Sequence, residues 1–129
     1  MPLKKTNPIL SKSWEDLKIH FEKISSEKIY GLFNKNPDRF KDLKIEWGNF
    51  LIDFSKNKIT TKTIDLLINL SNELGLKEAI NNHFKGSKIN ETENRSVLHT
   101  ALRSEKSEEI IVDGENIIPE IHENKEKLY

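Results

Sequence analysis

The chain of 129 residues contains no cysteine, which excludes disulfide bonds, thiolate zinc sites and cysteine nucleophiles. It has no net charge either, because 21 lysines and arginines balance 21 aspartates and glutamates. No overall field therefore draws the protein to nucleic acid or to an anionic membrane. The sequence also has no apolar run near the ~20 residues that cross a bilayer or the ~7–15 residues of a secretory signal. We expect a soluble protein, compatible with the cytoplasm, that binds neither nucleic acid nor membrane.

Common catalytic motifs are missing as well. There is no Gly-x-Ser-x-Gly elbow, no Walker loop and no Gly-x-Gly-x-x-Gly fingerprint. The four histidines are scattered and have no metal-ligand spacing: His20, His83, His99 and His122. We therefore expect no metal site, no cofactor and no catalytic residue in this chain.

Apolar residues are sparse for a chain of this length. They make up 35% of the sequence, charged residues make up 33%, and the mean hydropathy is -0.66. The length suits one domain, and the composition predicts a thin core.

Helical spacing dominates the first forty residues. A helix is predicted after a cap at Ser13, with the apolar positions Trp14, Leu17, Phe21 and Ile24. A second short apolar set follows: Ile29, Leu32 and Phe33. Asn36 and Pro37 are predicted to cap and begin a helical turn that carries Phe40.

The period then changes to alternation. Residues 43–54 predict a half-buried hairpin around a two-residue turn at Gly48 and Asn49. Thr60 or Thr61 is predicted to cap a helix that ends at Gly75, with an apolar face of Ile64, Leu67, Ile68, Ser71 and Leu74. A further short helix is predicted over residues 76–84.

Residues 90–103 predict another helix, because Asn90 and Glu93 resemble a capping box and apolar residues recur at 97, 98, 101 and 102. On such a helix Arg95, His99 and Arg103 would form a column at spacings of four. The column could grip a phosphate or a carboxylate. Alternatively, it packs within the fold and binds carbonyls or carboxylates such as that of Glu93, and this second interpretation is favoured.

The remaining residues predict two extended pieces, 110–112 and 117–118, around a turn at Asp113 and Gly114, then a helix from Pro119 that is still unfinished at Tyr129. The expected fold class is mainly α with one or two short β-hairpins.

One long string carries a family resemblance. Residues 84–103 follow the pattern Phe-x-Gly-x-Lys-Ile-Asn-x-Thr-Glu-x-Arg-x-Val-Leu-His-x-Ala-Leu-Arg, which resembles the N-terminal part of the glucose-6-phosphate isomerase family. Residues 36–40, 53–57 and 112–120 also resemble that family in order and spacing. Two positions depart from the pattern: Asn94 replaces a common glycine or aspartate, and Glu91 replaces a residue that is often aromatic.

The resemblance implies that residues 1–129 are a single N-terminal helical segment, with the catalytic α/β sugar-isomerase domains downstream and absent from this chain. The intact cytoplasmic enzyme, typically a homodimer, would interconvert glucose 6-phosphate and fructose 6-phosphate through a cis-enediol, in glycolysis and gluconeogenesis. No position here matches the family's catalytic or substrate-binding groups. Arg95 and His99 are expected to lie beside the path to the sugar and to act only through other residues. The alternative is a freestanding small helical interaction module derived from that segment.

Overall fold

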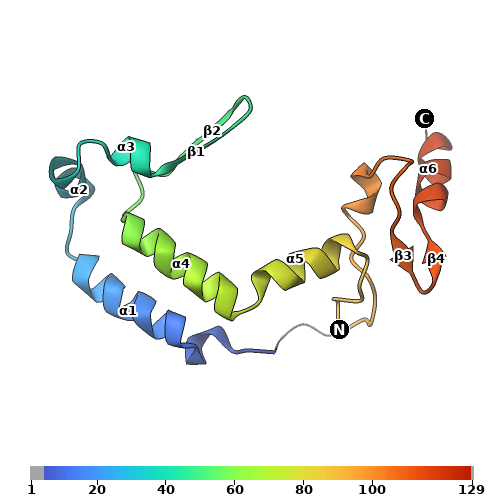
Figure 1. The fold of residues 1–129 in the computed structure, drawn as a ribbon, viewed down its shortest axis with the longest axis horizontal. Coiled ribbons are helices and arrows are strands. Elements are labelled where there is room, and N and C mark those ends of the chain that lie inside the picture. Colours follow the sequence, from blue (N-terminus) through green and yellow to red (C-terminus); the bar gives the residue numbers. More distant parts are fainter. Residues whose placement is uncertain (1–4, 129) are drawn as a thin grey trace. The chain divides into compact units, whose positions relative to one another are not determined.

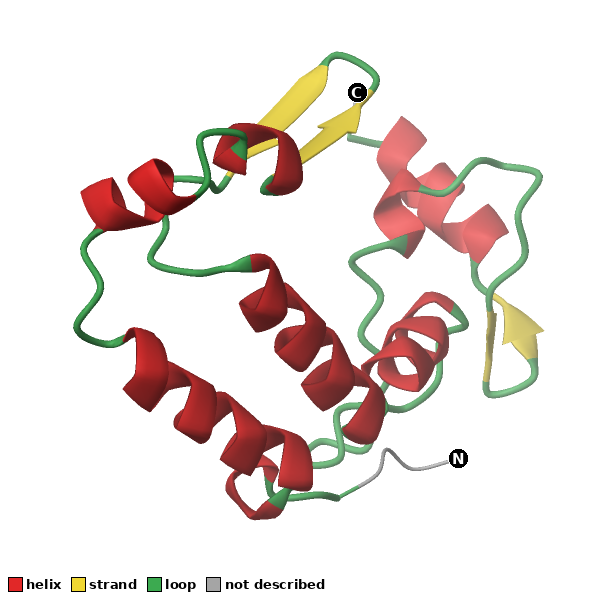
Figure 2. Ribbon diagram, turned by 60° about the vertical axis from the view of Figure 1, so that its left-hand side comes forward, coloured by secondary structure: helices red, strands yellow, loops and turns green. Residues whose placement is uncertain are grey.

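The computed structural model of the chain describes residues 5–128, which form a mostly helical fold with two small antiparallel strand pairs (Figure 2). This confirms the expected fold class. The contacts divide the chain into two compact units, one spanning Thr6–Leu74 and the other comprising Lys5 with the described residues from Gly75 onward. The first unit contains η1 (Pro8–Leu10), α1 (Lys12–Ile24), α2 (Ile29–Lys35), α3 (Arg39–Asp42), β1 (Lys44–Trp47), β2 (Phe50–Asp53) and α4 (Thr61–Glu73). The second contains α5 (Leu76–Phe84), η2 (Ala101–Arg103), β3 (Ile111–Val112), β4 (Glu115–Asn116) and α6 (Ile118–Glu126).

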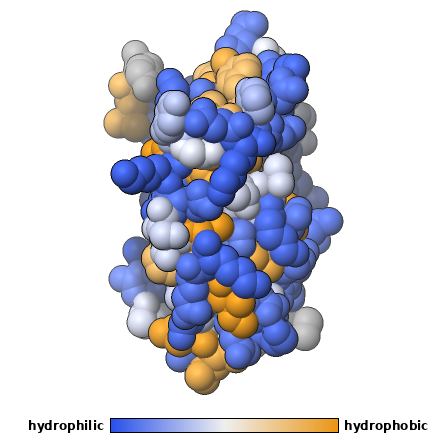
Figure 3. Space-filling view, turned by 90° about the vertical axis from the view of Figure 1, so that its left-hand side faces the viewer, coloured by the Kyte–Doolittle hydropathy of each residue, from blue (hydrophilic) through white to orange (hydrophobic). Residues whose placement is uncertain are grey.

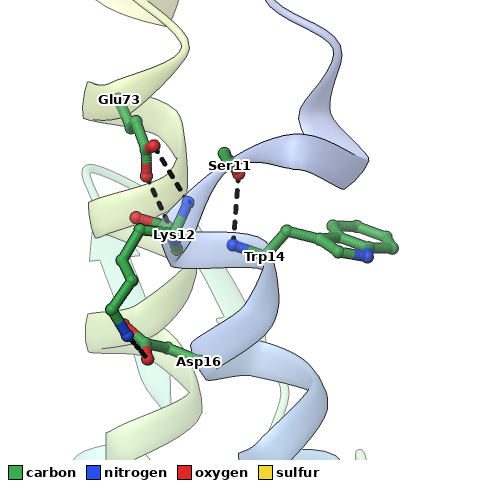
Figure 4. Close-up of polar contacts among 6 residues, drawn as sticks. Ser11, Lys12, Trp14, Asp16 and Glu73 are labelled. Atoms are coloured by element: carbon green, nitrogen blue, oxygen red, sulfur yellow. Dashed lines mark hydrogen bonds and ion pairs between the residues drawn. The ribbon is translucent and has the colours of Figure 1, made fainter.

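Helices α1 and α4 pack side by side in the first unit (Figure 1). The α1 helix starts two residues earlier than expected, because Ser11 and not Ser13 is its cap. The Ser11 hydroxyl accepts the N–H of Trp14 at 3.2 Å (Figure 4). Ser13 lies inside the helix and is buried, and its backbone N–H donates to the Glu73 carboxylate of α4.

The predicted helix at α4 is confirmed, with Thr60 as its cap and Gly75 directly after Leu74. Its predicted apolar face is only partly right. The structure buries Thr63 and Leu66, whereas Leu67 and Ile68 remain 46% and 51% exposed. Apolar side chains of α4 therefore face outward in this chain.

A buried arginine joins the short helices of the first unit to the loop before α4. The Arg39 side chain donates from Nε to the carbonyl of Ser55 at 2.7 Å, and from Nη2 to those of Asn57 at 2.7 Å and Ile59 at 2.5 Å. Contrary to expectation, α3 begins at Arg39 and not at Pro37. The side chain of Asn36 nevertheless accepts the N–H of Asp38, as an Asx turn does.

Strands β1 and β2 form the predicted hairpin, with Gly48 at a φ of +54° in the turn. The expectation that one face would be buried is wrong. The side chains of Ile45 and Trp47 on β1 are 53% and 76% exposed, and every residue of β2 is exposed. The hairpin alternates apolar and polar residues as predicted, but nothing in the described chain covers its apolar side chains.

The helix predicted over residues 90–103 is wrong. Only Ala101–Arg103 is helical, as the 3-10 turn η2, and Asn94 has a φ of +50° that no α-helix contains. Asn90 and Arg95 instead exchange two backbone hydrogen bonds, both 3.2 Å long, across a closed loop. The column of Arg95, His99 and Arg103 therefore does not exist.

A small apolar core organises the second unit. Ala101, Ile110 and Ile118 are buried together, and Leu98, Val112, Ile117 and Ile121 pack against them. The turn at Asp113 and Gly114 is confirmed, but β4 is Glu115–Asn116, and the expected strand at 117–118 is the start of α6. Helix α6 ends at Glu126 rather than running on, and Tyr129 lies outside the described residues.

Among residues 5–128 only six hydrophobic side chains are buried, which agrees with the expected thin core: Leu32, Leu43, Leu66, Ala101, Ile110 and Ile118. Figure 3 shows the counterpart, hydrophobic patches that interrupt an otherwise hydrophilic face. No helix in the described part of the chain is long and apolar enough to span a membrane.

Candidate functional site

The second unit contains an open hollow of about 620 Å³, whose lining includes Arg95 and His99, the two site residues expected from the sequence. Its polar lining comprises Lys88, Asn90, Asn94, Arg95, Ser96, His99 and Asp113. Its apolar lining comprises Val97, Leu98, Leu102, Val112 and Ile121. An open, half-apolar depression edged by cations is the kind of surface that accepts a polar or anionic group.

Gly86 fixes the start of the loop that forms one wall of the hollow. It has a φ of +72°, and a Cβ at this position would lie 2.8 Å from Cγ2 of Ile110 and 3.0 Å from Cγ2 of Val112. Only glycine combines that backbone conformation with so close an approach to β3. The Ser96 hydroxyl donates to the Gly86 carbonyl and ties the far end of the loop to its start.

The loop from Asn90 to Arg95 is closed mainly by its own polar groups. Besides the backbone bridge, the side-chain oxygen of Asn90 accepts the N–H of Glu93 at 3.3 Å and the Thr92 hydroxyl at 2.8 Å. The Asn90 amide donates to the Glu93 carboxylate at 2.8 Å. The capping contact expected from Asn90 and Glu93 thus forms, but it closes a turn instead of starting a helix.

Both permanent cations of the hollow are already paired. Nε of Arg95 lies 2.7 Å from the Glu93 carboxylate, and Nζ of Lys88 lies 2.6 Å from the carboxylate of Asp113. These pairs are largely exposed, so each stabilises the fold only slightly. The hollow can orient an anionic group, but such a group would compete with two carboxylates.

Arg95 pairs with Glu93, the carboxylate that the sequence suggested for it, but its side chain is 70% exposed and does not pack within the fold. The structure brings Arg95 and His99 to the same hollow, while Arg103 is not part of the lining. Sequence reasoning missed Lys88 and Asn94. Lys88 lies two residues before the Asn90 turn. It could have been found from the sequence, because it belongs to the same family motif as Arg95.

A second hollow, of about 430 Å³, lies along α1 in the first unit and is lined almost entirely by apolar groups. Its lining includes Trp14, Phe21 and Ile59, and its polar members include His20 and Thr63. Nε2 of His20 lies 2.8 Å from the Thr63 hydroxyl, which also accepts the Thr60 N–H at 2.9 Å. The contact between His20 and Thr63 holds α1 against α4, and the hollow beside it is an open apolar surface. In residues 5–128 no cluster of His, Asp or Glu could hold a metal ion.

Comparisons with known proteins point to one family. The family described as phosphoglucose isomerase matches residues 53–129, which include the whole wall of the larger hollow. The chain is 44% identical over 126 residues to the glucose-6-phosphate isomerase of Christiangramia forsetii, 46% identical over 127 residues to that of Buchnera aphidicola, and 47% identical over 127 residues to that of Wigglesworthia glossinidia brevipalpis. Each match covers 98% of this chain but only 23% of the relative.

Proposed function

This chain belongs to the phosphoglucose isomerase family, and from that premise we propose that it is the N-terminal part of a glucose-6-phosphate isomerase. The observation that carries the proposal is how much of each protein the alignment covers. It spans 98% of this chain but only 23% of a relative of that name. The intact protein would be a cytoplasmic aldose–ketose isomerase of glycolysis and gluconeogenesis. It would interconvert glucose 6-phosphate and fructose 6-phosphate, and act as a homodimer.

In the family, a glutamate moves a proton between two sugar carbons through a cis-enediol, and histidine and lysine side chains assist ring opening. Hydroxyl groups at a helix N-terminus hold the phosphate, where backbone N–H groups favour an anion. None of these groups matches a position of this chain. We therefore propose that the chain supports the catalytic domains and supplies no catalytic residue.

The structure of the larger hollow is consistent with a supporting role. Its loop is held by its own hydrogen bonds, and its cations are neutralised by Glu93 and Asp113. We assign Arg95 and His99 a place beside the path to the sugar, where they act through neighbouring side chains.

An isomerase assay separates the two parts of this proposal. Fructose 6-phosphate is supplied, and glucose 6-phosphate is detected with a coupled dehydrogenase, for the 129-residue chain and for the same chain followed by sugar-isomerase domains. We expect turnover only from the longer protein. Turnover by the 129 residues alone would show that the active-site groups are here, and no turnover by either would overturn the assignment of activity.

The role of Arg95 is tested in the longer protein with Arg95→Ala, and Arg103→Ala serves as the control because Arg103 lies outside the hollow's lining. If Arg95 acts on the site, Arg95→Ala lowers turnover per folded molecule more than Arg103→Ala does. Unchanged turnover together with a lower melting temperature would make Arg95 purely structural.

A freestanding interaction module remains the alternative, and the exposed apolar side chains of this chain agree with it as well. A complex of these 129 residues with an unrelated chain, in cells that also contain a separate active isomerase, would favour that alternative over the enzyme segment.

A further inference from the structure

The register of the β1–β2 hairpin sorts its side chains into two unlike faces. Residues that pair directly across two strands point to the same side of a sheet. Ile45 pairs with Ile52 and Trp47 with Phe50, so these four side chains form one face. The other face comprises the pairs Lys44 with Asp53 and Glu46 with Leu51. We call the first set, Ile45, Trp47, Phe50 and Ile52, the apolar hairpin face.

The apolar hairpin face is uncovered in this chain. Its side chains are 53% (Ile45), 76% (Trp47), 66% (Phe50) and 56% (Ile52) exposed. The rings of Trp47 and Phe50 stack on each other, with centroids 5.7 Å apart and planes 20° apart. The four side chains thus form a continuous hydrophobic surface, which soluble proteins normally cover or use.

The base of the hairpin is fixed while its tip projects, as Figure 1 shows for the ribbon leading away from α3. Leu43, directly before β1, is only 1% exposed, and its carbonyl accepts the N–H of Phe54 at 3.0 Å. Arg39 holds the Ser55 carbonyl just beyond β2. A two-stranded hairpin with neither face covered is marginal in water, so its projecting face is suited to another surface.

The area of this face decides between occupants. Two aromatic and two isoleucine side chains at these exposures offer roughly 400–500 Å², given the ~150–250 Å² that one aromatic side chain buries. A stable complex between separate chains needs about 800 Å² from each partner. A covalently linked occupant needs less, because linkage keeps it at a high effective concentration.

We propose that the apolar hairpin face docks onto the part of the same polypeptide that follows residue 129. This inference rests on the proposed function for the existence of that part, since the named relatives are about four times as long as the aligned region. The opposite face carries the charged side chains of Lys44, Glu46 and Asp53, and its exposed members Glu46 and Asp53 stay in solvent. The hairpin then contacts the catalytic domains through its apolar face only.

Leu51 and Ile52 provide a matched test in the complete protein, because they are neighbours on β2 with exposures of 55% and 56% here but lie on opposite faces. Each is replaced by cysteine, as Leu51→Cys or Ile52→Cys, and maleimide labelling at that position is followed by mass spectrometry. We expect labelling of the Ile52→Cys variant to be at least about tenfold slower than that of Leu51→Cys, as for a site that reacts only on local opening. Equal rates would overturn the proposal.

A readout on the unmodified protein guards against a variant that fails to fold. Hydroxyl radicals modify exposed tryptophan, and we expect little modification of Trp47 in the complete protein. Strong modification of Trp47 would contradict docking. Protection of Trp47 that disappears on dilution would assign the face to a second copy and would also overturn the proposal.

These measurements do not depend on catalysis. An inactive protein with position 52 protected would sink the proposed function but leave the docking intact. An active isomerase with position 52 fully reactive would do the reverse.

Discussion

The carboxylate of Glu73, at the end of α4, accepts the backbone N–H of Ser13 at 2.9 Å, across 60 positions of sequence. Its other oxygen accepts the N–H of Lys12 at 3.1 Å (Figure 4). The first N–H groups of a helix have no partner within the helix, and a negative charge there is favoured by the helix dipole. One side chain of α4 therefore completes the beginning of α1, and the two helices must run antiparallel.

Removing this contact should destabilise the first unit. We expect Glu73→Ala to lower the free energy of unfolding by about 1–2 kcal/mol, as the loss of a charged cap does. Urea unfolding followed by circular dichroism measures the change. Glu22→Ala is the control, because Glu22 is exposed on the same pair of helices. Equal losses in both variants would show that the Glu73 contacts contribute nothing specific.

Arg39 should tolerate no conservative replacement. Burial lowers the pKa of its guanidinium, yet arginine keeps its proton at neutral pH. We expect Arg39→Lys to lower the free energy of unfolding by about 2–3 kcal/mol, since an ammonium group cannot reproduce the planar fork and leaves main-chain carbonyls unpaired in a buried or half-buried setting.

The matched control for Arg39→Lys is Arg103→Lys, which makes the same chemical change at an exposed position. Thermal unfolding of both variants gives the comparison. A change in melting temperature no larger for Arg39→Lys than for Arg103→Lys would contradict the role given to the three carbonyl contacts.

Two glycines separate backbone strain from steric clash. Gly75 and Gly86 have φ angles of +73° and +72°, but an added Cβ meets nothing within 4 Å at Gly75 and overlaps Ile110 and Val112 at Gly86. We expect Gly75→Ala to cost about 1–2 kcal/mol, from the left-handed conformation alone. Gly86→Ala should cost about 2–4 kcal/mol, because overpacking adds to the strain.

Guanidinium chloride unfolding of both glycine variants supplies the two free energies. Because the backbone angles nearly coincide, their difference reports the clash with Ile110 and Val112. Were Gly75→Ala as harmful as Gly86→Ala, close packing of the loop on β3 would not be what position 86 requires.

Asp53 should make stability depend on acid. Hydrogen bonds from the side chain and the backbone of Ser55 lower the pKa of the Asp53 carboxyl from its ordinary 3.8. With the folded pKa below the unfolded one, the unfolded chain binds more protons, so the stabilisation is present above the unfolded pKa and is lost as pH falls through the folded pKa.

The measurement is the free energy of unfolding of wild type and Asp53→Asn between about pH 5 and pH 2, the range in which such a carboxyl titrates. We expect wild type to lose more stability than the variant as pH falls below about 4. Parallel pH profiles would mean that the carboxylate and Ser55 are not coupled in solution.

Local signals predicted most of the regular structure. The alternation of residues 43–54 and the Gly-Asn turn located β1 and β2, and Thr60 with Gly75 located α4, because these residues act on their immediate neighbours. The alternation could not reveal whether another part of the structure covers the apolar hairpin face. The Ile45 and Trp47 side chains have the pattern of a buried face and are exposed here.

The helix predicted at 90–103 failed for a related reason. Asn90 and Glu93 make the contact of a helix cap, but a turn uses the same contact, and Asn94 in the left-handed region stops the helix at once. The apolar spacing at Leu98 and Ala101 arises from packing on the core of the second unit. That packing depends on residues from other parts of the chain. The local spacing therefore could not distinguish a helix face from a loop that packs on this core.

The clamp formed by Arg39 has a consequence for how this region can evolve. Its three acceptors are carbonyls of the main chain, which every amino acid carries. Positions such as Asn57 and Ile59 can therefore drift without loss of the shape that leads into α4. Only the arginine itself, sixteen to twenty positions upstream of the carbonyls it binds, must be retained for this contact.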